Sequence, residues 1–580
     1  MILDLLEVYR KNADGDRLVI DNYQLKEGLY FKLYGSHKEP EILRIEKKVN
    51  YSGQLWEFIK TADFYSQLVD MNKPVDPKKQ IHSNNIFAVA FKAAILTEGA
   101  NAVGNFENSL ARYYQALLFP KKEDAEIISS YQFPPLDEQV IVNNQKYVIS
   151  LSEYIKQKIS ENKIKDNQYV KLYFAVAIEQ YIRESKRYLI PKIFNKNDYN
   201  ILINGTLYGL SNSNMGMNAK KPFLEHKTTA FKVPFRISAA DALAARNMFT
   251  WLDVQQDAEG KPVTEGYLPI GDSKVFTLVK PDERRQDAHY LHLTKGTQPV
   301  IDDYDFVPGL TDKLMPSFTL DNFLLLEDFN PQNISRRLEL EGLVDDWLFN
   351  KNLVKNYFNE SPKPNNWFSG FQVGLLIRYK EAMRNYFRKG DPRDFVSCID
   401  RLSQAMLKEM LLREPYKKLE DTKIAKGLNL RLSLFKYFSI KEKGKMGDRL
   451  ISLAAGLKEK LITDKTDEDI SCENDQEFYY YAGQLVRYLI SKSQAYHPTY
   501  AIIDHVTDAR DVGKFKQEIF KLHKKYNHAL GFNHIRYNRL MAAVMAYDCT
   551  TDTVNGFDLF LAGAASKNII YFKEAGEEKA

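Results

Sequence analysis

The pattern of apolar residues changes near residue 332, and this change limits the fold more than any other feature of the sequence. Before it, short runs of alternating apolar and polar residues are separated by Gly, Pro and Asn, which is typical of strands and loops. After it, apolar residues recur every three or four positions, as in amphipathic helices. The sequence therefore predicts an α+β protein: a mixed α/β amino-terminal region, then an all-helical carboxy-terminal region that ends in a small helix bundle.

Individual elements of the amino-terminal region are also predicted. Strands are expected at RLVI, LYFKLYG and EILRIEKKV within residues 1–50, and at the two runs around the Asn204-Gly205 turn. A helix is expected from Leu55 to Met71, with Phe58, Ala62, Tyr65 and Leu68 on one face. Another is expected over 176–188, ending before Pro191.

At 580 residues the chain is too long for one core. We expect a mixed α/β domain over 1–330, a helical middle region over 331–462 and a terminal helix bundle over 463–580. Polar stretches at 359–370 and 463–475 are expected to be linkers. In the bundle, apolar stripes predict helices over 478–489, 512–526 and 537–547.

Composition indicates a soluble cytoplasmic protein. No stretch of eighteen apolar residues is present, so no membrane span is expected. The start, MILDLLEVYRKN, lacks the features of a signal peptide. Cys398, Cys472 and Cys549 lie far apart and form no CxxC, so neither a disulfide framework nor a cysteine zinc site is expected.

The motif segment, residues 211–221, reads SNSNMGMNAKK and cannot bury an apolar face. Residues 218–236 carry a net charge of +4, against +5 for the whole chain. Amide side chains can read base edges, and lysines hold phosphates. These properties suit DNA binding, and the alternative is a solvated hairpin loop with a charged flank. The candidate DNA-binding residues of the loop are Asn212, Asn214, Asn218, Lys220 and Lys221, and the candidate contacts to the DNA backbone beyond it are Lys227, Lys232 and Arg236.

A second basic stretch lies in the terminal bundle, where residues 509–548 carry a net charge of +5. Lys514, Lys521 and Lys525 are predicted to share one helical face, and Arg536 and Arg539 lie on the next helix. We call these five residues the basic face. With Tyr526 and Tyr537 nearby it suits a single strand held by phosphate contacts and stacking. The alternative is an ordinary solvated surface.

Residue patterns for catalysis or metal binding are not found. In one helix His523 and His528 would point about 140° apart, and Gly531 separates them from His534. His289 and His292 have no third ligand nearby in sequence. The acidic run at 464–475 lacks the glycine and terminal glutamate of a calcium loop. Walker A, GxSxG and catalytic-cysteine patterns are absent from the sequence. We therefore expect no catalytic residues, no metal and no cofactor.

Several stretches, in order, resemble one protein family. They are IHSNNIFAVAFK from residue 81, SNSNMGMNAKKPFLEHKTTAFKVPFRIS from 211 with DALAARNMFTWL after it, EFYYYAGQLVRYLISKS from 477 and KYNHALGFNHIRYNRLMAAVMAY from 525. Together they resemble the large subunit of the type I-B CRISPR Cascade surveillance complex. The resemblance runs from about residue 80 to the end and is loose before that.

The resemblance implies a non-catalytic subunit of an RNA-guided DNA-binding complex in antiviral defence. Its amino-terminal domain would lie near the crRNA 5′ end, inspect the protospacer-adjacent motif (PAM) and help open the duplex. Its carboxy-terminal bundle would line the path of the displaced strand, stabilise the R-loop and help present the strand to a helicase-nuclease. The implied partners are crRNA, target DNA, the Cascade backbone subunits, the 5′-end-binding subunit and the small subunit. Guide pairing reads the sequence in such complexes, so the protein needs only a short motif and backbone contacts.

Two other functions remain open from the sequence: a DNA-binding regulator that acts alone, and a metal-dependent nuclease. The resemblance adds a further expectation, because the small subunit of this family can be translated from an internal start. Met446 follows KEKGK, whose codons form an almost wholly purine tract like a ribosome-binding site, and it precedes an amphipathic helix. We expect Met446 to be that start.

Overall fold

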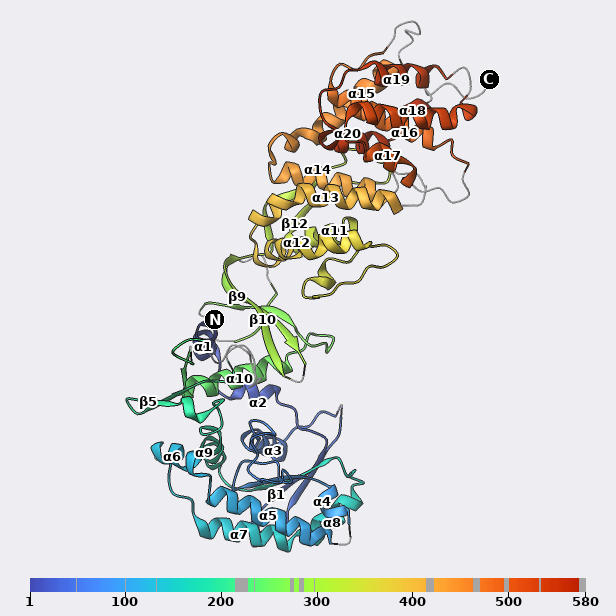
Figure 1. Cartoon of the computed structure of the whole chain (residues 1–580). Coiled ribbons are helices and arrows are strands. Elements are labelled where there is room, and N and C mark those ends of the chain that lie inside the picture. Colours follow the sequence, from blue (N-terminus) through green and yellow to red (C-terminus); the bar gives the residue numbers. More distant parts are fainter. Residues whose placement is uncertain are drawn as a thin grey trace. The chain divides into compact units, whose positions relative to one another are not determined.

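The computed structural model describes residues 1–47, 49–99, 101–131, 133–213, 228–233, 235–271, 276–280, 286–296, 298–413, 422–462, 470–494, 500–530 and 534–572. The chain divides into two compact units. The first unit comprises Met1–Lys280 and Asp287–Pro308, and the second comprises Pro281–Gln286 and Gly309–Ala580. Figure 1 labels many of the elements of both units.

A four-stranded sheet forms the centre of the first unit, with strand order β2-β1-β4-β3. Strands β1 and β4 run parallel, and the two outer strands pair with them antiparallel. Figure 1 shows α3 on one side of this sheet and α5 and α7 on the other. Both central strands are buried almost throughout, because helices cover both faces of the sheet. The bounds are β1 Gly28–Leu33, β2 Glu41–Ile45, β3 Ala88–Lys92, β4 Tyr169–Phe174, α3 Gln54–Tyr65, α5 Ala102–Leu118 and α7 Glu138–Ser150.

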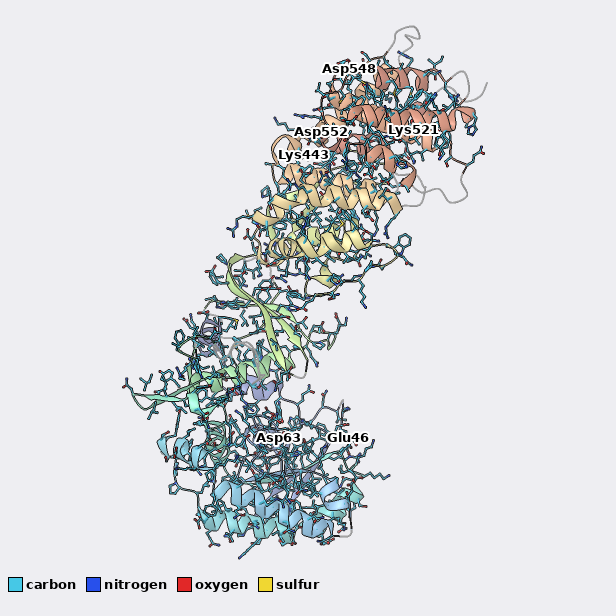
Figure 2. All side chains as sticks on the ribbon, viewed as in Figure 1. Glu46, Asp63, Lys443, Lys521, Asp548 and Asp552 are labelled. Carbon is cyan, nitrogen blue, oxygen red and sulfur yellow. The ribbon has the colours of Figure 1, made fainter. Side chains whose placement is uncertain are left out.

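A buried carboxylate of α3 binds this sheet through hydrogen bonds. Asp63, labelled in Figure 2, is 2% exposed. It accepts hydrogen bonds from Lys171 and Tyr173 of β4 and from Tyr23. Burial, followed by the negative charge of Asp63, raises the pKa of Tyr173. The charge of Asp63 is thus paired inside the unit, as a buried carboxylate requires.

Two smaller sheets complete the first unit. One has the order β5-β6-β7 and the other β10-β9-β8. Helix α10 begins at an N-cap, where Ser238 Oγ accepts a hydrogen bond from the Asp241 backbone N–H at 3.0 Å. Its buried face, including Trp251, packs with α1 and with the β8–β10 sheet. The bounds are β5 Ile201–Ile203, β6 Thr206–Gly209, β7 Ile237–Ser238, β8 Glu265–Pro269, β9 Gln286–Lys295, β10 Pro299–Leu310, α1 Ile2–Asn12 and α10 Ala239–Val254.

The other elements of the first unit are short connections or covering helices. They are α2 Arg17–Asn22, α4 Ala94–Thr97, α6 Lys122–Ser130, α8 Ser152–Glu161, α9 Ile178–Leu189 and the 3₁₀ turns η1 Gly35–His37 and η2 Asn197–Tyr199.

The second unit begins with an antiparallel strand pair and continues as helices around one apolar core. The strands are β11 Lys313–Leu320 and β12 Gln332–Arg336. The helices are α11 Arg337–Trp347, α12 Gly370–Lys389, α13 Arg393–Arg413, α14 Lys423–Tyr437, α15 Met446–Ile462, α16 Asp475–Ile490, α17 Asp504–Thr507, α18 Val512–Tyr526, α19 Ile535–Ala546 and α20 Thr553–Ala565. The described 3₁₀ turns are η3 Val354–Asn356, η5 Lys441–Lys445, η6 Tyr500–Ile503, η7 Asn527–Ala529 and η8 Ile569–Tyr571.

Helices α16 and α20 cross at very short distance in this core. A Cβ added at Gly563 would lie 2.1 Å from the Tyr480 carbonyl oxygen, and one at Gly483 would lie 2.1 Å from that of Phe560. Glycine at both positions therefore lets the two backbones approach each other. Helix α20 is buried along nearly its whole length and fills the centre of the terminal bundle.

The predicted fold class is confirmed: sheets occupy the amino-terminal region, and α11 to α20 make the carboxy-terminal region helical. The predicted helices over 176–188, 478–489, 512–526 and 537–547 correspond to α9, α16, α18 and α19. No helix in the described part of the chain has the length and apolarity to cross a membrane.

Two local predictions were wrong. RLVI is part of α2 rather than a strand, because it packs against α10 with Val19 buried. The helix expected from Leu55 to Met71 ends at Tyr65. Beyond it, Gln67 forms a β-bridge with Ser83, and the Val69 N–H donates to the Tyr188 hydroxyl at 3.2 Å. These tertiary hydrogen bonds replace the last expected helical turn.

Candidate nucleic-acid interface

The β5–β6 hairpin leads directly into the motif segment. Its turn is Asn204-Gly205, with φ of 48° and 77°, and Ile203 pairs with Thr206 across it. Positive φ at both turn residues matches the twist of the two strands, and Asn-Gly tolerates it best. The predicted turn and its strands are thus confirmed. In Figure 1 the ribbon at β5 extends away from the helices of its unit.

Three aliphatic side chains on this hairpin face solvent. Ile201, Leu202 and Ile203 are 39%, 57% and 48% exposed. Because successive side chains of a strand alternate, Ile201 and Ile203 share one face of the hairpin and Leu202 lies on the other. Exposed apolar patches commonly mark binding surfaces. We did not predict this feature, although the run of three apolar residues before an Asn-Gly turn breaks strand alternation and was a usable signal.

The motif segment is described only at its start. Asn212 is half-buried, and its Oδ1 accepts a hydrogen bond from Asn195 Nδ2 at 3.1 Å. Ser211 and Ser213 on either side are buried. Asn212 therefore anchors the beginning of the segment to the unit. The candidate residues Asn214, Asn218, Lys220, Lys221 and Lys227 lie outside the described residues, and their assignment stays a prediction.

The two described cations beyond the segment have different environments. Lys232 is exposed. Arg236 is half-buried, and its Nε donates to the Tyr199 carbonyl at 2.8 Å. Arg236 thus fixes the chain just before β7 onto η2, and Lys232 is the more accessible of the two to a phosphate.

On the basic face, α18 brings its lysines together around an acid. Lys514 and Lys521 each lie 2.9 Å from Glu518 Oε1. Hydrogen bonds from these lysines hold the pKa of Glu518 below its ordinary value. Figure 2 labels Lys521 on α18. The predicted common face is present, and Glu518 offsets part of its charge.

The other members of the basic face differ in accessibility. Lys525 is exposed, with its ammonium 5.5 Å from the centroid of the Tyr526 ring. On α19, Arg536 Nη1 donates to the Phe572 carbonyl, and both Arg536 and Arg539 are half-buried. The lysines of α18 are therefore the better-placed phosphate ligands.

The histidines considered as ligands have other contacts. His523 Nδ1 lies 2.7 Å from the Tyr537 hydroxyl, and His289 Nδ1 lies 3.0 Å from that of Tyr304. His292 Nδ1 lies 2.6 Å from Asp302. Among the residues that the structure describes, no group of three or more His, Cys, Asp or Glu side chains is arranged to hold a metal ion.

Met446 is the first residue of α15 and directly follows η5. A product that started there would begin at a helix boundary and contain α15 to α20.

Comparison with protein-family models, with curated proteins and with solved structures gives no match to this chain.

Proposed function

We propose that this chain is the large, non-catalytic subunit of an RNA-guided DNA surveillance complex of the type I-B Cascade kind. It works in the cytoplasm in antiviral defence, recognising a protospacer-adjacent motif and stabilising the R-loop. Its partners are crRNA, target DNA, the Cascade backbone subunits, the 5′-end-binding subunit, the small subunit and a helicase-nuclease.

The observation that carries the proposal is the β5–β6 hairpin with the motif segment after it. Exposed aliphatic side chains on a hairpin can insert between base steps, as apolar wedges do in proteins that distort DNA. The amides and lysines that follow can hold the adjacent duplex by its base edges and phosphates. Ile201, Leu202 and Ile203 thus serve to open the duplex beside the motif that the segment reads.

The terminal bundle supplies the second contact. Lys514, Lys521 and Lys525 lie on an accessible helix and bind the phosphates of an unwound strand. Because Glu518 pairs with two of them, their affinity for phosphate is moderated. Glu518→Gln keeps the side-chain shape and removes the competing charge, so it should tighten single-strand binding and steepen its salt dependence. Replacing Lys514 and Lys521 by Ala should weaken single-strand binding. It should also make the plot of log affinity against log salt concentration less steep, by about 0.7 for each lysine.

The motif segment is tested with a library of targets that carry randomised flanks. Lys220→Ala combined with Lys221→Ala should weaken binding to every flank. Asn218→Ala should relax the base preference, since a lost amide contact costs about 1–3 kcal/mol of discrimination. Unchanged binding and unchanged preference in all these variants would remove the segment from the interface.

Co-expression with backbone subunits and a guide-encoding repeat array tests the function as a whole. The chain should copurify with guide RNA and bind matched duplex only when a motif flanks it. Tight duplex binding by the chain alone would favour a stand-alone regulator, and metal-dependent cleavage by the purified chain would favour a nuclease.

A further inference from the structure

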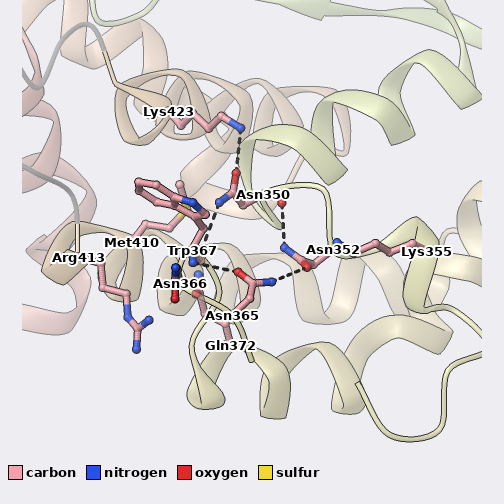
Figure 3. A pocket seen from close by; sticks show the side chains of 10 residues that line it. All are labelled: Asn350, Asn352, Lys355, Asn365, Asn366, Trp367, Gln372, Met410, Arg413 and Lys423. Carbon is pink, nitrogen blue, oxygen red and sulfur yellow. Dashed lines mark hydrogen bonds between the residues drawn. The ribbon is translucent and has the colours of Figure 1, made fainter. Parts of the chain in front are cut away.

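A polar pocket lies in the second unit, away from every residue assigned above. Its volume is about 650 Å³, within the ~300–1,000 Å³ of most ligand pockets. Five amides, three cations, a tryptophan and a methionine line it: Asn350, Asn352, Asn365, Asn366, Gln372, Lys355, Arg413, Lys423, Trp367 and Met410. Figure 3 shows these side chains, with Lys423 at the top of the view and Arg413 at the lower left. We call this site the amide pocket.

The wall of the amide pocket is held in a strained, hydrogen-bonded conformation. Asn350 and Lys351, directly after α11, have φ of 49° and 60°. Two successive non-glycine residues in this region are uncommon and cluster at functional sites. Asn352 is buried, and its Oδ1 accepts a hydrogen bond from Asn365 Nδ2 at 3.2 Å. This bond joins the two segments that form the wall, the turn at 350–352 and the loop at 365–367.

Trp367 is presented to solvent by a fixed backbone. Its N–H donates to Asn365 Oδ1 at 2.9 Å, and its carbonyl accepts from Asn350 Nδ2 at 3.3 Å. The next residue, Phe368, is 1% exposed and anchors the loop in the core, whereas Trp367 is 66% exposed. A large aromatic ring thus projects from a hydrogen-bonded backbone at a polar pocket, which suits stacking against a flat ligand.

A buried donor in the pocket has no hydrogen-bond partner among the residues that the structure describes. Gln372 is 1% exposed, and its Oε1 accepts from the Ser369 N–H at 2.9 Å in the capping box of α12. Its Nε2 is buried and makes no hydrogen bond with the described part of the chain. Leaving such a donor unsatisfied is unfavourable, so an acceptor supplied by a ligand would be bound there.

The charge of the lining favours an anionic ligand. No acid is among the described residues that line the pocket. Lys423 lies 2.8 Å from Asp346 and donates to Asn350 Oδ1 at 3.0 Å, so it supports the wall. Arg413 lies 3.4 Å from Glu409 and is exposed. Residues 414–421, between Arg413 and Lys423, lie outside the described part and are not included in the site.

We propose that the amide pocket binds an unpaired nucleotide of a single nucleic-acid strand. The base stacks on Trp367, the amides of Asn366 and Gln372 meet its polar edge, and Lys355 and Arg413 hold the flanking phosphates. Aromatic stacking, amide contacts to base edges and basic residues beside them are what single-strand recognition uses. The inference rests on the proposed function for the source of the strand, but the site is testable on the purified chain alone.

The test uses a twelve-nucleotide oligothymidine with the purified full-length chain carrying Lys514→Ala and Lys521→Ala, because the basic face would otherwise bind the same strand. Trp367→Ala should weaken binding by about 10–100-fold, the usual effect of removing one stacking ring, and Trp367→Phe should restore most of it. Phe119→Ala removes a comparably exposed ring of the first unit and should leave the affinity unchanged. Thermal melting checks that each variant is folded.

A second readout locates the strand directly. The same oligonucleotide with 5-iodouracil should crosslink under ultraviolet light to the peptide that contains Trp367, as mapped by mass spectrometry. In this background, equal affinity with and without Trp367→Ala, crosslinks only elsewhere, or equal affinity for a duplex would overturn the site. Binding of thymidine monophosphate as tight as that of the oligonucleotide would overturn its assignment to a strand. No guide RNA is present in the assay, so its failure leaves the surveillance-complex proposal standing.

Discussion

The guanidinium of Arg431 in α14 donates two hydrogen bonds to the carboxylate of Asp558 in α20. Nε lies 3.0 Å from Oδ1 and Nη2 lies 2.9 Å from Oδ2, and the two side chains are 0% and 1% exposed. Arg431 also bonds Asp400 of α13, which Lys443 of η5 contacts at 2.7 Å. This network ties the terminal bundle to the helices that precede it.

Breaking the pair on one side should be costly. Asp558→Asn removes the fully buried one of the two counter-ions of Arg431 and leaves Asp400 as the other, so it should lower the free energy of unfolding by at most about 3–5 kcal/mol. The double variant Arg431→Met with Asp558→Leu removes both charges and should recover most of that loss. Urea denaturation of the three proteins measures this, and equal stability of wild type and Asp558→Asn would contradict the role of the pair.

The same pair bears on the internal start at Met446. Expression of the native gene should yield a second product starting there, which intact mass spectrometry detects. Synonymous recoding of the five codons before Met446 should abolish it and leave the full-length chain unchanged. The product contains Asp558 but not Arg431, so Asp558→Asn should be neutral or stabilising in the product. Persistence of the product after recoding would exclude Met446 as its start.

The close crossing of α16 and α20 should tolerate no side chain. Gly563→Ala would place a methyl group against the backbone of Tyr480 and should destabilise the protein by about 3 kcal/mol, the upper range for overpacking. Gly456→Ala is the matched control, because it lies in α15 with nothing within 4 Å of the added Cβ. It should stabilise by about 0.5–1 kcal/mol. A similar melting temperature for both variants would argue against the crossing.

Stability should depend on pH through Asp475 at the start of α16. Its Oδ2 accepts from the N–H and hydroxyl of Thr551 at 2.7 Å each, and Oδ1 accepts from Tyr547 at 2.9 Å. Burial raises the pKa of Asp475, but the hydrogen bonds from Thr551, Thr550 and Tyr547 outweigh it and hold the pKa well below its ordinary 3.8.

A depressed carboxyl pKa adds stability that is complete above the pKa of the unfolded chain and is lost as the pH falls from there through the folded value. Wild type should therefore melt above Asp475→Asn at pH 7 and pH 6. The difference in melting temperature between wild type and Asp475→Asn should shrink as the pH falls below about 4. Thermal melts across this range test the prediction, and a margin that stays constant or grows with acid would refute it.

Local patterns were enough to predict α16, α18 and α19 of the terminal bundle. Phe515, Ile519 and Leu522 form the stripe of α18, and all three are buried as predicted. Helix α20 was missed because it is buried on every side, so it shows no amphipathic period. Its glycines also weaken a helix prediction, although here they permit the close crossing.

Long-range polar contacts were beyond sequence reasoning. Arg431 and Asp558 are 127 positions apart, and nothing local marks either as half of a buried pair. The amide pocket likewise combines side chains of the turn after α11, the loop at 365–367, α12, α13 and α14. In the sequence, residues 359–370 read as a polar linker, because Asn and Pro there indicate a loop and not what the loop faces.

The central claim is that this chain enables guide-directed DNA opening. Its most direct measurement is permanganate footprinting of a supercoiled, motif-flanked target, using the guide-loaded complex reconstituted with and without the chain. Unpaired thymines should extend across the protospacer only with the chain present, and charge reversal of the basic face should shorten the footprint while motif recognition on short duplexes persists. A full footprint without the chain, or with the reversed variant, would contradict the corresponding part of the claim.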